Sequence, residues 1–451
     1  MRSVVTVLIT TAGLMSSSMA GAAESEADRS STAATRSNTD DDSLADADRE
    51  VLDSNLDDPA SLLPEIRERR AEKDSLLPVS PLFWLHGLTD GGKKWLHDST
   101  GIQLGADITH LFQGVSEALP HEDHWGTATT ANLAGSWELI ARGKPNRGQL
   151  FFHGQARWDY GKPGPEELGP GSLGSAIGTA NTFSAYQSKP VLLRNLYWQQ
   201  GSQEAGWAYR IGKITPDATM SSSQHLNAST TFMPNTSIGS FSNAYADSGL
   251  GVVAAWFPTD RIRLLGLFSD ANANRENFGD PGEGDFFKAL EFGMKIAPRT
   301  EKAGYSKITF WHTDGTDDGE AANANTGEAG WGFFVKHEQE LTADGRAVGI
   351  VRYGRSFNDS AIYKQLASVH ILYYDPSFLK WIRNDVIGVA FNWAEIPPGA
   401  ARSEYNVEVF YRFPIFPSVD TTLSYQSVIR PALDRDNNHA SVFSLRIRTA
   451  F

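Results

Sequence analysis

The chain of 451 residues contains no cysteine, which excludes disulfide bonds and any structural cysteine–zinc site. It also has no run of eighteen or more consecutive apolar residues, so no segment can cross a bilayer as an apolar helix. The formal net charge of −14 argues against a nucleic-acid partner, which would favour a basic face. The sequence lacks G-x-S-x-G, P-loop and H-E-x-x-H motifs, so it predicts no enzyme of those classes and no cofactor.

The first residues have the three-part order of a secretory signal, with Arg2, an apolar core from Val4 to Leu14, and small residues up to Ala23. Residues 24–75 are rich in Asp, Glu, Ser and Ala and contain no aromatic residue. Such a segment buries too little apolar area to offset the entropy of ordering it. We therefore expect a signal peptide at 1–23 and an acidic periplasmic arm at 24–75, disordered or weakly helical. The arm is either a solvated tether or a contact to peptidoglycan or a periplasmic partner.

From residue 76 onward the sequence is aromatic and strand-like; the whole chain has 24 Phe, 12 Trp and 13 Tyr. Residues 148–161, 206–214, 289–296 and 404–413 each alternate apolar with polar side chains. This period of two indicates strands with one apolar and one polar face. The mean hydropathy of −0.34 is that of a soluble protein. A transmembrane β-barrel has the same modest value, because alternation hides its membrane face.

Short turns and long loops follow one another along this region. Asp344-Gly345 lies in a short turn, whereas 162–186 and 215–244 are long and rich in small and polar residues. Short turns on one rim and long loops on the other are typical of an outer-membrane barrel. A soluble β-sandwich also alternates, but about 370 residues exceed its usual size. At roughly 23 residues per strand with its connection, the region would form about 16 strands.

Aromatic residues favour the barrel over the sandwich, because they lie at the ends of apolar faces, where an interfacial girdle would be. The residues are Trp158, Tyr160, Trp207, Tyr209, Trp311, Trp393, Tyr405 and Phe413. The sequence therefore predicts an all-β fold at residues 76–451, a transmembrane antiparallel β-barrel of about 16 strands with inward-folded loops.

The chain ends in SVFSLRIRTAF, which itself alternates. Arg446 and Arg448 share one face, and the apolar residues share the other: Phe443, Leu445, Ile447 and Phe451. A barrel must pair its last strand with its first to remove both edges, so a strand is expected here. The apolar face with its terminal aromatic resembles the signal read by the barrel-assembly machinery.

Residues 404–451 resemble the C-terminal end of the carbohydrate-selective porin (OprB) family. Residues 249–272, 210–213 with the long loop that follows, and 90–104 are similar to the family in order and spacing. The resemblance implies a 16-stranded barrel in the outer membrane of a Gram-negative bacterium, narrowed by inward-folded loops and surrounded by lipid. It also implies that the barrel admits small sugars by facilitated diffusion.

The family places an arginine of its constriction near Arg157, which shares a strand face with His153 and Gln155. An ordinary wall residue is the alternative for Arg157, and residues 215–244 form the loop expected to fold into the pore. Alternation directs six further side chains to the lumen: Arg210, Glu291, Glu408, Arg412, Gln426 and Arg446. Such charged and amide groups hydrogen-bond to sugar hydroxyls and let the solute leave again.

Two other functions remain open. A general or anion-preferring porin without sugar selectivity would use the same arginine-rich lumen. An outer-membrane hydrolase would need a serine beside a histidine, for which His153 or His312 is available. The stretches 121–124 and 270–274 carry metal-type ligands but lack the further ligands of a zinc or calcium site, so the sequence predicts no metal.

Overall fold

The computed structural model describes residues 75–77, 92–93, 95–186, 189–220, 222–223, 225–296, 303–316, 323–376, 382, 384–396, 402–416 and 419–450. All of them belong to one compact unit, residues 48–451. The expected signal peptide, nearly all of the acidic arm, and Phe451 lie outside the described residues.

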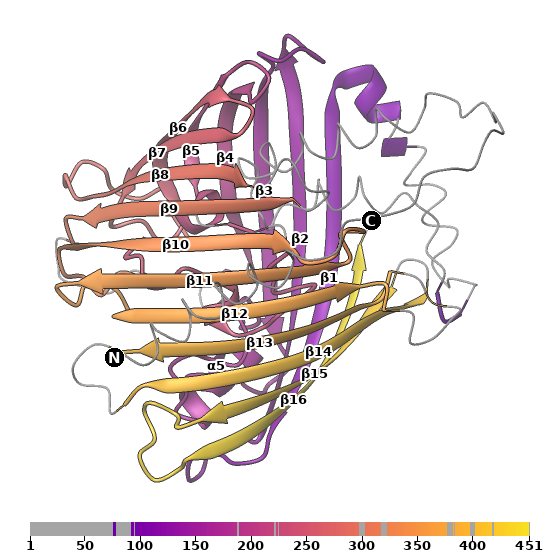
Figure 1. Ribbon diagram of the computed structural model, residues 1–451, viewed down its shortest axis with the longest axis vertical. Helices are drawn as coiled ribbons and strands as arrows, with labels where there is room; N and C mark the ends of the chain where they lie inside the picture. Colours follow the sequence, from indigo (N-terminus) through magenta and orange to yellow (C-terminus); the bar gives the residue numbers. More distant parts are fainter. Residues whose placement is uncertain are drawn as a thin grey trace, which may run out of the picture. The chain divides into compact units, whose positions relative to one another are not determined.

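The described chain forms a closed barrel in which every strand pairs antiparallel with its sequence neighbours and β1 pairs with β16 (Figure 1). The strands are β1 (Ile102–Val115), β2 (Trp125–Ile140), β3 (Gly148–Asp159), β4 (Val191–Ser202), β5 (Trp207–Ile214), β6 (Gly249–Thr259), β7 (Ile262–Asp270), β8 (Phe286–Ile296), β9 (Gly304–Thr313), β10 (Gly330–Glu340), β11 (Ala347–Phe357), β12 (Gln365–Tyr374), β13 (Val386–Glu395), β14 (Glu404–Phe416), β15 (Val419–Ile429) and β16 (His439–Ala450). The predicted all-β barrel of about 16 strands is confirmed.

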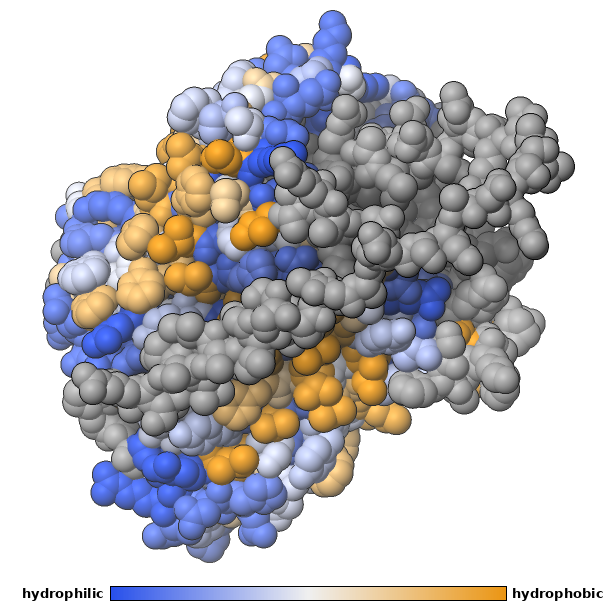
Figure 2. All heavy atoms as spheres, in the orientation of Figure 1, coloured by the Kyte–Doolittle hydropathy of each residue, from blue (hydrophilic) through white to orange (hydrophobic). Residues whose placement is uncertain are grey.

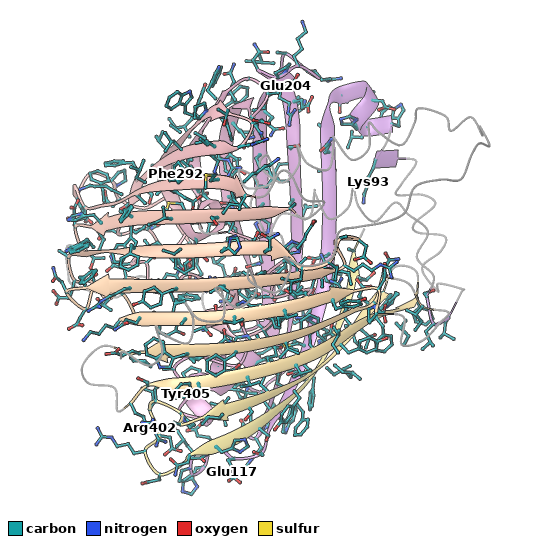
Figure 3. The ribbon with its side chains drawn as sticks, in the orientation of Figure 1. Lys93, Glu117, Glu204, Phe292, Arg402 and Tyr405 are labelled. Carbon is teal, nitrogen blue, oxygen red and sulfur yellow. The ribbon has the colours of Figure 1, made fainter. Side chains whose placement is uncertain are left out.

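Alternation along each strand separates the two surfaces of the barrel wall. In β8, Leu290 and Phe292 are exposed on the outward face, whereas Glu291 between them is buried on the inward face. Figure 3 labels Phe292 and Tyr405, which share this outward direction on β8 and β14. Figure 2 shows the outward apolar residues gathered over the middle of the strands, with hydrophilic residues toward the ends. This is the surface that a hydrocarbon layer requires.

The last strand closes the barrel in the predicted orientation. Leu445 of β16 lies opposite Phe112 of β1, and Arg448 lies opposite Thr109. Phe443, Leu445 and Ile447 are exposed on the outward face, while Arg446 and Arg448 are buried inside. Closure at this seam pairs the backbone groups of both terminal strands, so neither strand leaves an open edge in the membrane.

Trp311 corrects one sequence-based expectation. It was assigned to the outward aromatic girdle, but its side chain is 3% exposed and packs inside the barrel against Phe287, with ring centroids 6.1 Å apart. Its neighbour Phe310 is the outward residue and is 54% exposed. Both faces of β9 carry aromatic rings because its inward face packs against other side chains, not against water, so alternation alone did not identify the outer face.

The two rims of the barrel differ in the length of their connections. Residues 203–206 and 260–261 join strands on one rim, whereas 160–190 and 215–248 join strands on the other. In Figure 3, Glu204 of a short turn lies near the top, and Glu117 and Arg402 of the opposite rim lie near the bottom. The long loops carry short helical turns: α5 (Pro165–Glu167), η1 (Leu168–Ser172), α6 (Pro216–Thr219) and α7 (Asn235–Ile238).

The interior of the barrel has its own hydrophobic core. Phe241 and Tyr245 from residues 215–248 pack in one buried cluster with inward side chains of the wall, among them Phe287, Trp311 and Phe334. The long loops therefore fill part of the lumen, and any pathway must run beside them. In the part of the chain that the structure describes, no helix combines the length and apolar character needed to cross a membrane.

Candidate functional site

The loop 215–248 is attached to the barrel wall by buried cations. Arg352 of β11 donates hydrogen bonds to three carbonyl oxygens around the C-terminal end of α7: Thr236 at 2.9 Å, Ser237 at 2.5 Å and Gly239 at 2.6 Å. Charged donors form stronger hydrogen bonds than neutral ones, and carbonyls at a helix end attract cations. Arg352 thus holds the loop across the lumen.

The same loop is bound by side chains of three further strands. Arg446 of β16 donates to the carbonyl oxygens of Ala228 at 2.6 Å and Thr231 at 2.9 Å. Arg412 of β14 donates to the carbonyl of Thr230 at 3.1 Å. Lys307 of β9 donates a hydrogen bond to the carbonyl oxygen of Ser222 in the loop at 3.1 Å. Contacts from β9, β11, β14 and β16 make residues 215–248 a fixed part of the lumen, as the sequence predicted for 215–244.

The loop 160–190 also enters the lumen and is held by β1, β14 and β15. Its Thr179 carbonyl accepts hydrogen bonds from Gln426 of β15 at 2.7 Å and from Gln113 of β1 at 3.0 Å. The carboxylate of Glu404 accepts the backbone N–H of Ala176 at 2.8 Å. Both inward loops therefore depend on polar side chains of the barrel wall for their positions.

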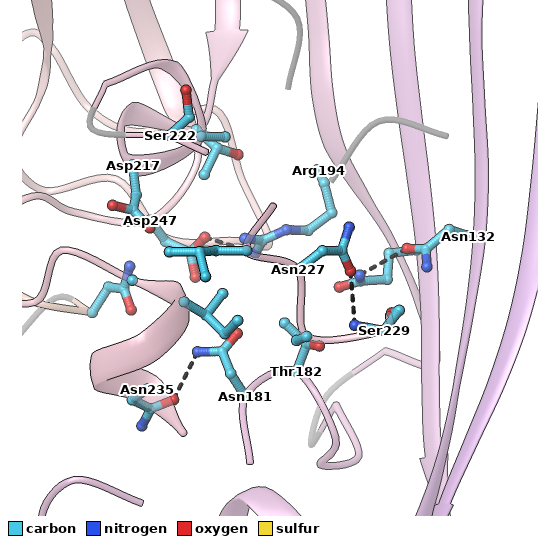
Figure 4. Close-up of a pocket in the computed structure, with 18 of the residues that line it drawn as sticks. Asn132, Asn181, Thr182, Arg194, Asp217, Ser222, Asn227, Ser229, Asn235 and Asp247 are labelled. Carbon is cyan, nitrogen blue, oxygen red and sulfur yellow. Dashed lines mark hydrogen bonds and ion pairs between the residues drawn. The ribbon is translucent and has the colours of Figure 1, made fainter. Parts of the chain in front are cut away.

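A cavity of about 350 Å³ lies between these two loops and the wall formed by β1–β4 and β16 (Figure 4). Its polar lining from the wall consists of Asp107, Asn132, His153, Gln155, Arg157, Arg194, Asn195 and Arg448. Glu166, Asn181, Asp217, Asn227 and Asp247 are among the lining residues from the two loops, and Arg275 comes from the connection between β7 and β8.

Hydrogen bonds connect the wall side of this cavity into one network across four strands. Arg448 pairs with Asp107 at 2.5 Å, and Asp107 accepts the amide of Asn132 at 2.7 Å. The Asn132 carbonyl oxygen in turn is shared by Gln155 at 2.8 Å and His153 at 3.0 Å. These contacts restrict the rotamers of all five side chains, so the polar groups are held in place before a solute enters.

Arg157 continues the network toward the loop 160–190. Its Nε donates to Gln155 Oε1 at 2.8 Å, and its Nη1 lies 3.4 Å from Glu166 Oε2. Within the described residues these are its side-chain hydrogen bonds, so the Nη2 hydrogens have no protein acceptor. Arg157 therefore combines a fixed position with donors that a solute oxygen can use.

Asp247 joins two arginines on the loop side of the cavity. Its carboxylate lies 2.6 Å from Arg194 and 3.0 Å from Arg275. Burial would raise the pKa of Asp247, but the two guanidinium groups together lower that pKa below its usual value. Burial raises the pKa of Asp217, although its carboxylate accepts a hydrogen bond from the Ser240 hydroxyl at 2.8 Å.

Acidification is expected to loosen the Asp247 contacts only at low pH. The ordinary pKa of an aspartate carboxyl is about 3.9, and that of Asp247 is lower in the folded protein. Its ion pairs are therefore intact at every pH above about 3.9 and are lost only as the pH falls through this lowered pKa. We expect the contribution of these ion pairs to channel conductance, measured as the difference between wild type and Asp247→Asn, to be constant from neutral pH to about pH 4 and to shrink below it. Single-channel recordings across this range, with Asp247→Asn alongside, provide the check. The Asn variant should already differ from wild type at neutral pH, and identical traces would contradict this role for Asp247.

The structure brings together three of the nine side chains expected along the substrate path. Arg157, His153 and Gln155 line the cavity side by side on β3. The other six also face the barrel interior but are outside the cavity lining. Arg412, Gln426 and Arg446 donate to inward loops, and Glu408 accepts the Met233 N–H at 2.9 Å.

The remaining two expected residues are packed against other wall residues. Arg210 donates to Gln199 at 2.7 Å and stacks on Tyr197, with its Cζ 4.9 Å from the ring centre. Glu291 is fully buried in an ion pair with Arg263. All nine lie at inward positions of their strands, but alternation carries no information on whether water or a loop lies beyond the side chain. Their place along the substrate path stays a prediction.

Sequence reasoning missed most polar residues of the cavity, among them Asp107, Asn132, Arg194, Asp247 and Arg275. Asp107 and Asn132 are on strands, and their inward parity would have been a usable signal. Asp247 and Arg275 are on loops that are far apart in sequence, where no periodicity applies. No group of three or more His, Asp or Glu side chains with the arrangement of a metal site occurs among the residues that the structure describes.

A closed sixteen-stranded barrel whose inward loops leave a polar cavity beside one wall is the architecture of a porin. This chain belongs to the OprB family of carbohydrate-selective porins, whose family model matches residues 172–451. The family resemblance inferred from the sequence is confirmed.

Solved structures support the same fold. The structure of Pseudomonas putida OprB at high pH is 13% identical and covers 80% of this chain and 97% of its own length, with a TM-score of 0.65. The low-pH structure of the same protein is 12% identical and covers 81% of this chain and 97% of its own, with a TM-score of 0.50. Identities this low establish a shared fold alone. No curated protein matches the chain.

Proposed function

We propose that the protein is an outer-membrane porin through which small uncharged sugars pass by facilitated diffusion, along the cavity beside Arg157. The observation that carries this proposal is the balance of charge around the cavity. Among the described lining residues, four arginines face four carboxylates: Arg157, Arg194, Arg275 and Arg448, and Asp107, Glu166, Asp217 and Asp247.

Balanced charge suits a solute that both donates and accepts hydrogen bonds. A sugar hydroxyl can donate to a carboxylate and accept from a guanidinium, so it replaces water at either partner. The contacts remain individually weak enough for the solute to leave, which conduction requires. An anion-preferring porin would instead need an excess of cations, and Asp247 lies within 3.0 Å of both Arg194 and Arg275.

The hydrolase alternative receives less support. His312 lies on the outward face of β9 and is exposed there, away from the cavity. His153 is in the cavity, where its ring nitrogen contacts the Asn132 side chain. Channel proteins make up the family to which the chain belongs. We therefore favour passage of the solute without chemical change.

The outward face supports the proposed location. Its apolar side chains would contact lipid of a Gram-negative outer membrane, and the inward polar face would contact water. We further propose that Phe443, Leu445 and Ile447 on the outward face of β16, together with Phe451, are read by the barrel-assembly machinery.

Single-channel recording in planar bilayers tests the function. We expect a low conductance in salt that falls in a saturable manner when glucose or maltose is added. Liposome swelling should show faster entry of monosaccharides than of disaccharides, since the cavity volume is only about 350 Å³. A conductance that does not respond to either sugar would contradict the carbohydrate proposal and favour a general porin.

Replacing Arg157 with alanine should weaken the sugar block about tenfold, the effect of losing one charged hydrogen-bond donor. The reason is that Arg157 has donor hydrogens without a protein acceptor in the described part of the chain and lines the cavity. The half-blocking sugar concentration is the measurement. Arg147→Ala, in the short turn before β3, is the matched control. Sugar should block this variant at the same concentration as wild type.

A further inference from the structure

The strongest unexplained feature near the cavity is Tyr186, which is absent from the cavity lining. Its side chain is 8% exposed. Its ring centre lies 4.8 Å from the guanidinium carbon of Arg157 and 5.6 Å from that of Arg275. Both distances are within the range of cation–π attraction. Among the described residues, no other ring makes such contacts with two arginines.

The phenol hydroxyl fixes the ring on the side of β3. It donates to Gln155 Oε1 at 2.5 Å, the same oxygen that accepts Arg157 Nε at 2.8 Å. An amide oxygen has two lone pairs and can accept both hydrogens. Gln155 thereby orients the tyrosine and the arginine relative to one another, and Gln155 is itself held by Asn132.

Arg275 needs such a contact more than Arg157 does. Its side chain is 37% exposed and comes from the loop between β7 and β8, where it forms an ion pair with Asp247. Arg157, Arg194 and Arg275 are close enough to repel one another, since the charges of Arg194 and Arg275 act on Arg157. The negative ring face of Tyr186 lowers the cost of holding two like charges near each other.

We infer that Tyr186 is a positioning residue for sugar selection, because it sets the spacing and orientation at which Arg157 and Arg275 face the cavity. The inference rests on the proposed function and adds to it the source of selectivity between sugars. A planar guanidinium directs pairs of N–H groups at neighbouring oxygens in a fixed geometry. Two such groups at a fixed spacing distinguish sugars that differ in the orientation of one hydroxyl.

The test compares the half-blocking concentrations of glucose, galactose and mannose in single-channel recordings of the full-length protein. Tyr186→Leu removes the ring and should weaken the block by the preferred sugar about fivefold, the loss of the cation–π contacts. The three sugars should then block with nearly equal concentrations. Tyr186→Phe keeps the ring and loses only the hydrogen bond to Gln155, so it should reduce the differences between the three sugars less than Tyr186→Leu does and keep their wild-type order. A purely structural role would not move the ratio between sugars in this way.

Two further variants make the result decisive. Tyr160→Leu replaces an exposed tyrosine on the outward face. The three sugars should block this variant at the same concentrations as wild type. Arg275→Gln removes the guanidinium of an exposed side chain and leaves a shorter polar one. It therefore tests the arginine pair even where Tyr186→Leu fails to fold. Heat-modifiable migration on gels detects such a failure. Arg275→Gln should also equalise the three sugars.

The outcomes separate this inference from the function on which it rests. If wild-type channels show sugar block that differs between the three sugars, and Tyr186→Leu or Arg275→Gln keeps the same ratios, the inference is overturned while the function stands. Equal impairment of Tyr186→Phe and Tyr186→Leu also overturns it, because the ring would then be irrelevant. Wild-type channels without any sugar block overturn both.

Discussion

Replacing Arg352 with alanine is expected to raise the single-channel conductance at least twofold and to abolish block by sugars. Arg352 is buried and donates to three carbonyl oxygens of the loop 215–248. Each hydrogen bond to a charged group stabilises a structure by about 1.5–3 kcal/mol. Loss of three such bonds should release α7 from the wall and widen the lumen. Recordings in salt, with and without glucose, measure both effects.

Arg355→Ala is the matched control, because Arg355 lies on the same strand, β11, with the opposite parity, and its guanidinium packs over Phe357. It should conduct like wild type. The proposal that wall cations hold the constriction fails if Arg352→Ala retains both the wild-type conductance and the wild-type block. Arg352→Ala is also expected to admit disaccharides in liposome swelling, because the loop 215–248, rather than the barrel wall, limits the size of the solute.

Replacing Arg263 with alanine is expected to lower the free energy of unfolding by about 3–5 kcal/mol, the range for breaking a buried ion pair. Arg263 of β7 and Glu291 of β8 are both fully buried and ion-paired. Glu291 also accepts the Thr309 hydroxyl at 2.9 Å and lies 3.8 Å from Lys307. The substitution leaves that carboxylate without its closest cation, and a buried charge without its partner is costly. Urea-induced unfolding in lipid vesicles, followed by tryptophan fluorescence, measures the change.

The nearby Arg261 provides the control for this experiment. It lies in the short turn between β6 and β7 and is exposed, so Arg261→Ala should unfold close to wild type. Sugar block in folded Arg263→Ala channels should match wild type, because neither Arg263 nor Glu291 lines the cavity. A stability loss below about 1 kcal/mol, the value of an exposed pair, would contradict the structural role of this ion pair.

The inward residues show that alternation predicts the face of a side chain but not its partner. Alternation in β14 and β16 places Glu408, Arg412 and Arg446 on the inward face of the barrel. Their partners are carbonyl and N–H groups of residues 228–233, which are about 180 to 220 positions away in the chain. No local pattern encodes a contact at that separation. Those side chains therefore looked like pore lining in the sequence, whereas in the structure they hold a loop.

Trp311 shows that alternation does not decide which face of a strand is the outer one when both faces carry aromatic residues. Phe310 and Trp311 are both large and apolar, and the strand gives each of them one face. Which face meets lipid depends on the register against β8 and β10, where Phe310 pairs with Leu290 and Phe333. A barrel with an empty lumen would have a polar inner face, but this lumen contains a hydrophobic core that takes up Trp311.

The sequence by itself determined the barrel. Its period-two alternation, the contrast of short turns with long loops, and the apolar face of the last strand are local or repeated signals, and each follows from the need to bury or expose every second side chain. The tertiary structure alone decided the site. The cavity joins Arg157 and Asp107 on the wall to Asp247 and Arg275 on separate loops. Only closure of the barrel and the tertiary placement of these loops bring the charges within hydrogen-bonding distance of their partners.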